Sequence, residues 1–426
     1  MRRLYIGLLL MAIPWATQSV AQDHLAWTEP DDDEESLIDQ EKDWIAYNRW
    51  SVSAEFLMWW TKDTPCPVPL ASTAPASAQT NPADSYPPGN LSNPDTVVVL
   101  GGGDIPIHMQ PGGRFNVGLG LGDEDRYGVE MNFLFLGNTT REQTVTSNGS
   151  QDQFLTTPYN AVDSIVFPAP GTPYANFLAG PASFNGSLSN AGAATLTTQM
   201  QFYGGELNGL WNLTGGNGFA WHLLGGYRLL SVNERLYLET TQLDNNNFTG
   251  QFINTLDKFK TQNYFNGGQL GIRGDWRSGN WYIGGTFKLA LGSTHEVVTV
   301  SGSTTTNTGA HYVQIPVTTV PFGTYAQPTN IGTNSRDQFA LLPEFTLRVG
   351  MQLAPSIRYF VGYNFLYLSN LVRPGNQIDG TINPLQTAGF NGGLPASPNG
   401  GGRPAPLFVS SDFWAQGLTF GAEIGW

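Results

Sequence analysis

From Trp50 onward, hydrophobic and polar residues alternate with a period of two along most of the chain. Such alternation is typical of a β-strand whose two faces meet different surroundings. The clearest case is residues 414–426, where aromatic and aliphatic side chains dominate one face while Gly, Thr and Glu occupy the other. The run ends on an aromatic residue, Trp426, as outer-membrane β-barrels do, and we expect the barrel-assembly machinery to read this terminus.

The same pattern recurs in runs that begin near eight further positions, namely Trp50, Tyr127, Tyr203, Trp221, Leu270, Trp281, Phe339 and Tyr359. In these runs the apolar face carries no charge, and the opposite face holds nearly all the charged groups. A soluble β-sandwich also alternates, so alternation alone leaves both architectures open. Trp and Tyr gather at the ends of the runs, as the two interfaces of a membrane barrel require. A membrane barrel with an apolar outer face and a polar inner face is therefore favoured.

The connections between the runs alternate strictly between short and long, which is the habit of outer-membrane barrels. The short ones are Gly122–Arg126, Gly215–Gly218, Ser278–Gly279 and Ala354–Ser356. The long ones are about Asp63–Gly112, Gly137–Thr197, Glu239–Thr261, Val298–Arg336 and Leu371–Ser410. The pattern predicts an all-β, antiparallel, up-and-down transmembrane β-barrel of about ten strands, with short periplasmic turns and long outer loops. A further hairpin around Val162–Phe167 would make twelve strands, and this alternative stays open.

The N-terminal residues indicate export. A basic start is followed by the apolar run Leu4–Trp15 and by Ser19–Ala21, whose small residues suit signal peptidase. We expect residues 1–21 to be a cleavable signal peptide, because the apolar run is shorter than the ~20 residues that a spanning helix needs. Residues 22–45 carry ten acids and one base and are predicted to form a disordered periplasmic tail. Residues 46–426 then form the barrel, located in the cell outer membrane.

Composition narrows the function classes. The formal net charge is −14 and only 13% of residues are charged, where an ordinary soluble domain has about 25%. This balance disfavours nucleic acid as a partner, because phosphate neutralisation needs clustered Lys and Arg. The single cysteine, Cys66, excludes an intrachain disulfide and a cysteine-built metal site. None of the five histidines has metal-ligand spacing, and no G-x-S-x-G motif occurs, so neither a metal, a cofactor nor a catalytic residue is predicted.

Several pieces of sequence resemble the putative beta-barrel porin-7 family of planctomycete-type bacteria over roughly Trp50 to Trp426. The matching pieces include Trp50–Lys62, Leu223–Leu230, Asn263–Gly274, Lys288–Gly292, Leu342–Glu344, Val361–Tyr367 and Val372–Asp379. The resemblance implies an outer-membrane pore embedded in the lipid bilayer. The acidic tail lies outside it.

Ionisable residues on the predicted inner faces are the candidates for lining a lumen. They are Glu55, Glu130, Glu206, His222, Arg228, Arg273, Asp275, Lys288, Glu344, Arg348, Arg358 and Glu423. An open lumen would select small solutes by the electric field of its charged residues and by the size of the solute. Alternatively, acids and bases pair across the bore and plug it, since ten strands enclose little free space.

The sequence is consistent with three functions. The first is a porin-like channel for small solutes, and the second is a plugged structural or surface-binding barrel whose long loops engage an extracellular partner. The third is an outer-membrane hydrolase.

Overall fold

A computed structural model of the chain describes residues 50–75, 88–121, 126–149, 153–162, 171–181, 190–216, 218–244, 250–308, 313–387 and 402–426. The predicted signal peptide and acidic tail lie outside these ranges. No helix within them has the length and apolar character needed to cross a membrane.

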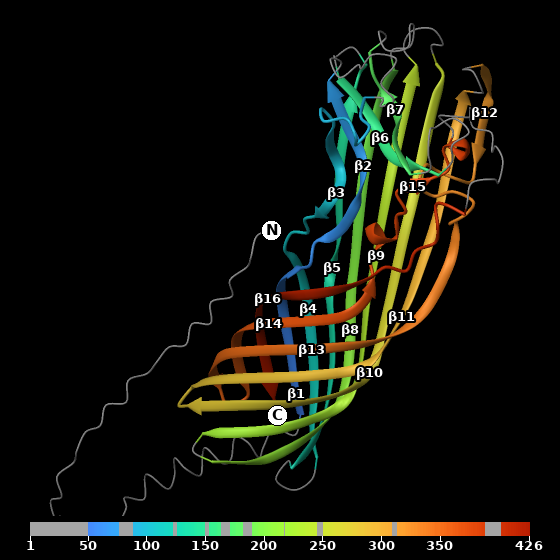
Figure 1. Cartoon of the computed structure of the whole chain (residues 1–426). Coiled ribbons are helices and arrows are strands. Elements are labelled where there is room, and N and C mark those ends of the chain that lie inside the picture. Colours follow the sequence, from blue (N-terminus) through green and yellow to red (C-terminus); the bar gives the residue numbers. More distant parts are fainter. Residues whose placement is uncertain are drawn as a thin grey trace, which may run out of the picture. The chain divides into compact units, whose positions relative to one another are not determined.

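Ten antiparallel strands form a closed barrel, as the alternation predicts (Figure 1). In order around the barrel they are β1 (Trp50–Thr61), β4 (Gln110–Leu121), β5 (Tyr127–Ser147), β8 (Asn190–Gly216), β9 (Phe219–Asp244), β10 (Phe252–Ser278), β11 (Trp281–Thr308), β13 (Gly332–Ala354), β14 (Ile357–Val372) and β16 (Ser410–Gly425). The first and last strands, β1 and β16, pair along their length and close the barrel. At this seam Trp50 and Trp426 exchange two backbone hydrogen bonds of 2.9 and 3.0 Å.

An apolar belt surrounds the barrel next to its short connections. On β10, Leu270 is 74% exposed, and on β5, Met131 is 61% exposed, whereas inward neighbours such as Leu57 are buried. The belt comprises residues 50–60, 110–121, 127–136, 203–213, 219–229, 264–276, 281–291, 339–353, 359–367 and 414–426. The strands turn back tightly below it, helped by Gly218 and Gly279, whose positive φ angles of 77° and 55° suit glycine.

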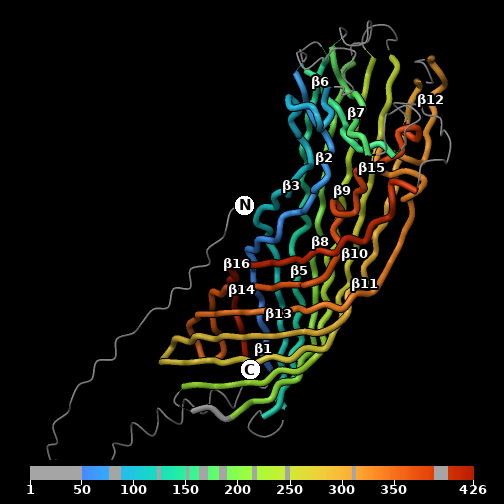
Figure 2. Tube along the Cα trace, viewed as in Figure 1, coloured from blue at the N-terminus to red at the C-terminus, as the bar shows by residue number. Residues whose placement is uncertain are grey.

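Four strands, β8 to β11, continue far beyond the belt and are 26 to 28 residues long. Figure 2 shows them running on together past β13, β14 and β16. The long connections predicted from the sequence contain much of these extensions, and also the ends of β5 and β13. This prediction is wrong for residues 137–147, 190–197, 239–244, 252–261, 298–308 and 332–336, which are strand.

The extensions were missed because their pattern is inverted. In the belt part of β9, Leu229 faces outward and Arg228 is buried inside, whereas further along Leu236 and Leu238 are buried and Arg235 is exposed.

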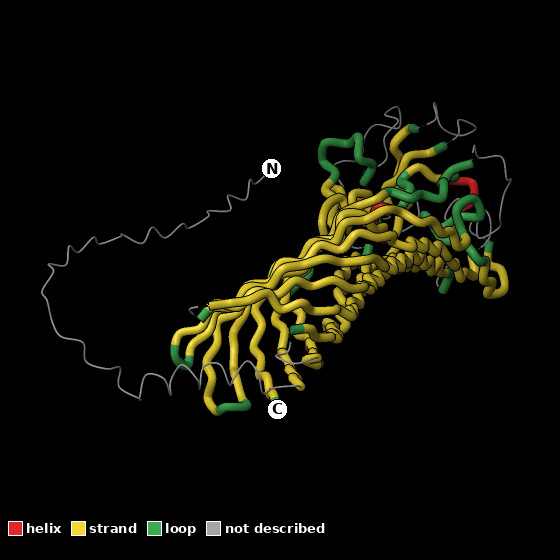
Figure 3. Tube along the Cα trace, turned by 90° about the horizontal axis from the view of Figure 1, so that it is seen from below, coloured by secondary structure: helices red, strands yellow, loops and turns green. Residues whose placement is uncertain are grey.

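A second sheet packs against the inner face of these extensions. It contains β2 (Thr64–Pro75), β3 (Val97–Ile105), β6 (Gln153–Ala161), β7 (Thr172–Ala179) and β15 (Thr381–Ile382). The two sheets share one apolar core, which includes Leu70, Tyr159, Leu236, Phe259 and Val300. We call this two-sheet body the outer lobe. Figure 3 shows that strands make up most of it as well.

The second sheet also settles the strand count. A hairpin does lie in the connection between β5 and β8, but its strands β6 and β7 pair with each other, and β6 also pairs with β2, so neither strand joins the barrel. The twelve-stranded alternative is therefore wrong. One further strand, β12 (Gln314–Val320), adds to β11 at the edge of the lobe. Two short 3-10 helices, η4 (Pro374–Gln377) and η5 (Pro384–Gln386), lie in the connection between β14 and β16.

Candidate functional site: the interior of the barrel

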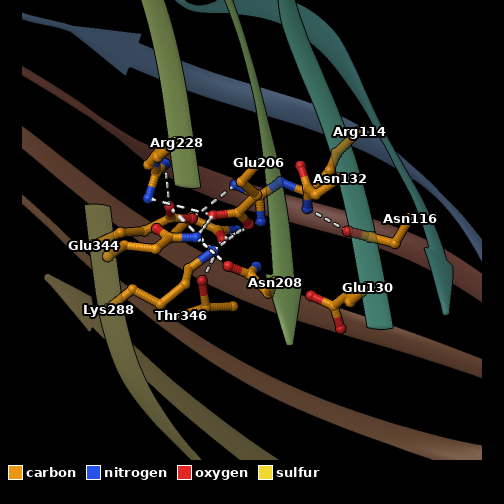
Figure 4. Close-up of polar contacts among 12 residues, drawn as sticks. Arg114, Asn116, Glu130, Asn132, Glu206, Asn208, Arg228, Lys288, Glu344 and Thr346 are labelled. Carbon is orange, nitrogen blue, oxygen red and sulfur yellow. Dashed lines mark hydrogen bonds and ion pairs between the residues drawn. The ribbon is translucent and has the colours of Figure 1, made fainter. Parts of the chain in front are cut away.

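The barrel interior holds a buried layer of three acids and three bases, five of which are labelled in Figure 4. Residues two apart on a strand share a face, so each strand presents alternate side chains to the barrel interior. Each of the six residues is at most 7% exposed: Glu55, Glu206, Glu344, Arg114, Arg228 and Lys288.

Glu344 on β13 is the centre of this ionic layer. Its carboxylate pairs with Arg114 at 3.0 Å, with Lys288 at 3.5 Å and with Arg228. Lys288 also pairs with Glu206 at 2.5 Å. The layer thus joins strands from opposite walls of the barrel, and its charges cancel.

Amide and hydroxyl side chains fill the space around the ionic layer. Gln269 donates to Glu206 at 2.7 Å and to Asn208 at 2.5 Å. Asn364 accepts from Arg114 at 2.9 Å and from Thr346 at 2.8 Å. Charges in a low-dielectric interior need such partners, because an uncompensated buried charge costs several kcal/mol.

A second group of ion pairs lies nearer the short connections and is partly open to solvent. Arg273 donates to Glu130 at 2.8 and 3.1 Å, Arg348 donates to Glu55 at 2.6 Å, Arg358 pairs with Glu423, and His222 Nε2 lies 3.6 Å from Asp275. All twelve candidates from the sequence therefore lie inside the barrel, each in at least one ion pair. Apart from His222, the interior of the belt holds six acids and six bases in these pairs and carries no net charge.

Sequence reasoning missed Arg114. It lies on β4, where Gly112, Gly113, Gly118 and Gly120 interrupt the alternation. The signal that could have found it is the pairing of β1 with β4, which places Arg114 directly opposite Glu55.

An apolar layer lies inside the barrel immediately beyond the ionic layer. It includes Trp59, Phe202, Phe265, Leu342 and Phe413, all buried. The ring of Phe202 lies 6.5 Å from that of Trp59 and 5.8 Å from that of Phe413, and these three rings come from β1, β8 and β16. The guanidinium of Arg114 lies 5.3 Å from the Trp59 ring and joins the two layers.

A third layer is built by the connection between β14 and β16, which enters the barrel above the aromatic rings. Arg373, which is fully buried, donates two hydrogen bonds to Glu234, from Nε at 2.8 Å and from Nη2 at 2.6 Å. A third bond, of 2.7 Å, goes from its Nη1 to the carbonyl of Asp63. The backbone N–H of Val372 donates to Asn263 at 2.9 Å. Neither Arg373 nor Glu234 was a candidate from the sequence, although Arg373 belongs to the matching piece Val372–Asp379.

Cys66 and Asp257 are titratable groups buried in the outer lobe, outside the belt. Burial raises the pKa of the Cys66 thiol to about 12, so it is a packed core residue. Burial also raises the pKa of Asp257 to about 6, against three backbone N–H groups that hold its charge. Those donors belong to Thr324, Tyr325 and Ala326, at 3.2, 2.9 and 2.7 Å. Asp257 thus anchors the segment that follows β12.

No group of three His, Cys, Asp or Glu side chains in the described ranges is placed to hold a metal ion. The chemistry that the interior supports is pairing of charges and packing of rings.

A protein family described as "Putative beta barrel porin-7" matches residues 50–426, the whole of the barrel and the outer lobe. The chain belongs to this family. Membership agrees with the observed barrel and with a place in the outer membrane. No curated protein matches the chain.

Three solved structures are similar to this porin-7 family member. The outer membrane protease OmpT from Escherichia coli is 9% identical, with a TM-score of 0.38, over 89% of this chain and 97% of that one. OmpT of Vibrio cholerae is 9% identical, with a TM-score of 0.17 and coverage of 88% and 97%. A Pseudomonas aeruginosa FadL homologue is 6% identical, with a TM-score of 0.21 and coverage of 88% and 89%.

Proposed function

We propose that the protein is a closed outer-membrane barrel whose task is to hold the outer lobe at the cell surface, as a structural or surface-binding element. The single observation that carries this proposal is the filled bore. The ionic layer, the aromatic layer and the Arg373 layer lie one above the other, and each is buried.

The energetics support a bore that stays closed. Opening a path would separate Glu344 from three bases and Arg373 from Glu234, and breaking one buried pair by removing a partner costs about 3–5 kcal/mol. Barrels of about eight strands are just wide enough to be filled by side chains, and water-filled channels appear at 16 to 18 strands. A ten-stranded barrel is near the filled end of this range.

The outer lobe is suited to carry a binding surface. Strands β8 to β11 run without a break from the belt into the lobe, so the lobe is fixed to the barrel by continuous backbone pairing. Binding sites built on sheets are held more firmly than those on free loops. An extracellular partner would meet the polar outer faces of the lobe.

A channel for small solutes is the second candidate, since the family description names a porin and the ion pairs near the short connections are partly exposed. These pairs could form the entrance of a pore that opens when the upper layers move. The hydrolase considered from the sequence gains no support from a catalytic arrangement among the side chains described above.

Solute flux separates the two candidates. The refolded full chain is placed in liposomes filled with an impermeant polymer, and swelling is followed after addition of a small neutral sugar. We expect the same rate as in protein-free liposomes, while a porin of known size swells its liposomes rapidly. Swelling that scales with the amount of protein would overturn the closed-barrel proposal in favour of the channel.

A further inference from the structure

Three basic side chains lie together on the outward face of the outer lobe. Arg235 on β9 and Lys260 on β10 are direct cross-strand partners. Lys258, two residues along β10, pairs with Tyr237, and its Nζ lies 5.9 Å from the centre of that ring. Arg235 and Lys258 are exposed, Lys260 is half-buried, and the inward neighbours Leu236 and Phe259 are buried, so all three bases face away from the core.

These bases differ from most others in the protein, because none of them forms an ion pair within the described part of the chain. Ten bases are paired with carboxylates: Lys62, Arg114, Arg228, Arg273, Lys288, Arg336, Arg348, Arg358, Arg373 and Arg403. In a chain with a net charge of −14, three unpaired neighbouring bases are a marked local concentration of positive charge.

The height of this basic patch above the belt suggests its partner. Leu229 and Tyr264 are the last exposed large side chains of the belt on β9 and β10. Arg235 lies six residues beyond Leu229, and Lys260 lies four residues beyond Tyr264. At about 3.3 Å per residue and a tilt of about 45°, the bases are roughly 9–14 Å beyond the apolar belt. The headgroup region extends about 5–8 Å beyond the hydrocarbon core of a bilayer. The long Lys and Arg side chains can extend back from their backbone positions into this region.

The patch is confined to one side of the barrel. Just outside the belt, β13 exposes Asp337, which pairs with His295, and β5 exposes Glu142. Glu239, exposed on β9, limits the patch at its upper end. The long-connection end of an outer-membrane barrel faces the cell exterior. Within the described residues, the basic patch is therefore bordered by exposed acids and lies at the end of the barrel where the outer leaflet is expected.

We propose that Arg235, Lys258 and Lys260 bind the phosphate-bearing headgroups of the outer leaflet and so fix one side of the lobe to the lipid surface. Attraction of each base to an anionic surface strengthens binding about fivefold, and the attraction is screened by salt. This inference depends on the membrane placement of the barrel and not on whether the bore is closed, so the flux experiment can fail without affecting it.

The test uses the refolded full chain in neutral detergent micelles, titrated with phosphatidylglycerol or with phosphatidylcholine, and bound lipid is counted by native mass spectrometry. We expect the protein to bind phosphatidylglycerol at least tenfold more tightly than phosphatidylcholine. The triple variant Arg235→Gln, Lys258→Gln, Lys260→Gln should lose at least tenfold in affinity for phosphatidylglycerol. The matched control is Arg126→Gln, which removes an exposed base beside a short connection and should leave the affinity within twofold of the wild type.

Three results would overturn the proposal. These are equal binding of the two lipids, a triple variant that binds like the wild type, or full competition by millimolar inorganic phosphate, which would indicate a small-anion site. Because the three side chains lie on the surface, the variant should fold. Heat-modifiable migration on a denaturing gel shows whether the triple variant has folded. If the triple variant does not fold, the single variant Lys258→Gln provides a second test, and we expect it to lose about fivefold in affinity for phosphatidylglycerol.

Discussion

The two halves of β9 obey opposite rules. In the belt half, Leu223 and Leu229 face outward and Arg228 lies inside, whereas in the outer half Leu236 faces inward and Arg235 faces outward. The backbone ladder with β10 continues through both halves without a shift in register. The surroundings therefore set the pattern, since lipid requires an apolar exterior and water permits a polar one.

The same comparison holds for what fills the two halves. The belt half contains the paired charges and amides around Glu344, whereas the outer half is filled mainly by aliphatic and aromatic side chains around Phe259. A charged interior is sensitive to loss of a partner, whereas an apolar interior is sensitive to loss of volume. Substitutions of each kind should reveal which half they disturb.

The largest effect is expected from Glu344→Ala, because it removes the carboxylate that pairs with Arg114, Arg228 and Lys288. We expect a loss of about 3–5 kcal/mol in the free energy of unfolding, measured by urea unfolding of the refolded protein in lipid vesicles. Glu423→Ala is the matched control: it breaks a pair that is partly exposed and should cost about 1 kcal/mol or less. Equal losses would mean that the ionic layer contributes nothing special to the belt half.

Phe259→Ala should destabilise the outer half by about 3 kcal/mol, because it opens a cavity in the shared core of the two sheets. The measurement is the rate of proteolysis within the lobe, while heat-modifiable migration reports the barrel. Leu270→Ala on the same strand faces away from the core and is 74% exposed, so it should leave proteolysis unchanged. A barrel that is lost together with the lobe would contradict the separation of the two halves.

Acidity should act on the outer half through Asp257. Its folded pKa of about 6 lies above the ordinary value of 3.8, so the folded lobe binds more protons than the unfolded chain between these limits. The free energy of unfolding therefore falls as pH rises from about 4 to about 6, by about 1.4 kcal/mol per unit of pKa difference. Above about pH 6 this contribution no longer changes. The difference in unfolding free energy between wild type and Asp257→Asn, measured from pH 4 to 7, should show this slope. A difference that is constant over that range would contradict it.

The smallest perturbation is chemical labelling of Cys66. Its thiol is buried and has a pKa of about 12, so reaction with a maleimide should be at least 100-fold slower in the folded protein than in urea, since the thiolate is the nucleophile. Phe259→Ala should accelerate labelling and Glu423→Ala should not. Fast labelling of the folded wild type would show that the lobe core opens readily.

The belt was predictable from the sequence, and the lobe was not. Runs such as Tyr127–Phe135 alternate strongly because lipid tolerates no charge on the outer face. The alternation therefore identifies both the strand and its lipid-facing side. Arg114 escaped because glycines blur the alternation of β4. The extensions of β9 to β11 escaped because polar residues such as Arg235, Lys258 and Thr299 face outward there and apolar residues face inward, which is the reverse of the membrane pattern.

The contacts of the interior were predictable only in part. Inward acids and bases could be assigned from each strand separately, but which of them meet depends on register and tilt across the bore. The ion pair of Arg373 with Glu234 joins residues 139 positions apart, and nothing local indicates that a connection between strands enters the barrel.

The closed bore is tested most directly by planar-bilayer recording of the refolded, heat-modifiable protein in molar potassium chloride. We expect a flat current with no step conductance at either polarity, for the wild type and for the Glu423→Ala control alike. Reproducible conductance steps in the wild type would contradict it. Steps whose ion selectivity changes when Glu206 and Arg273 are both replaced by alanine would instead assign the paired interior to an open channel.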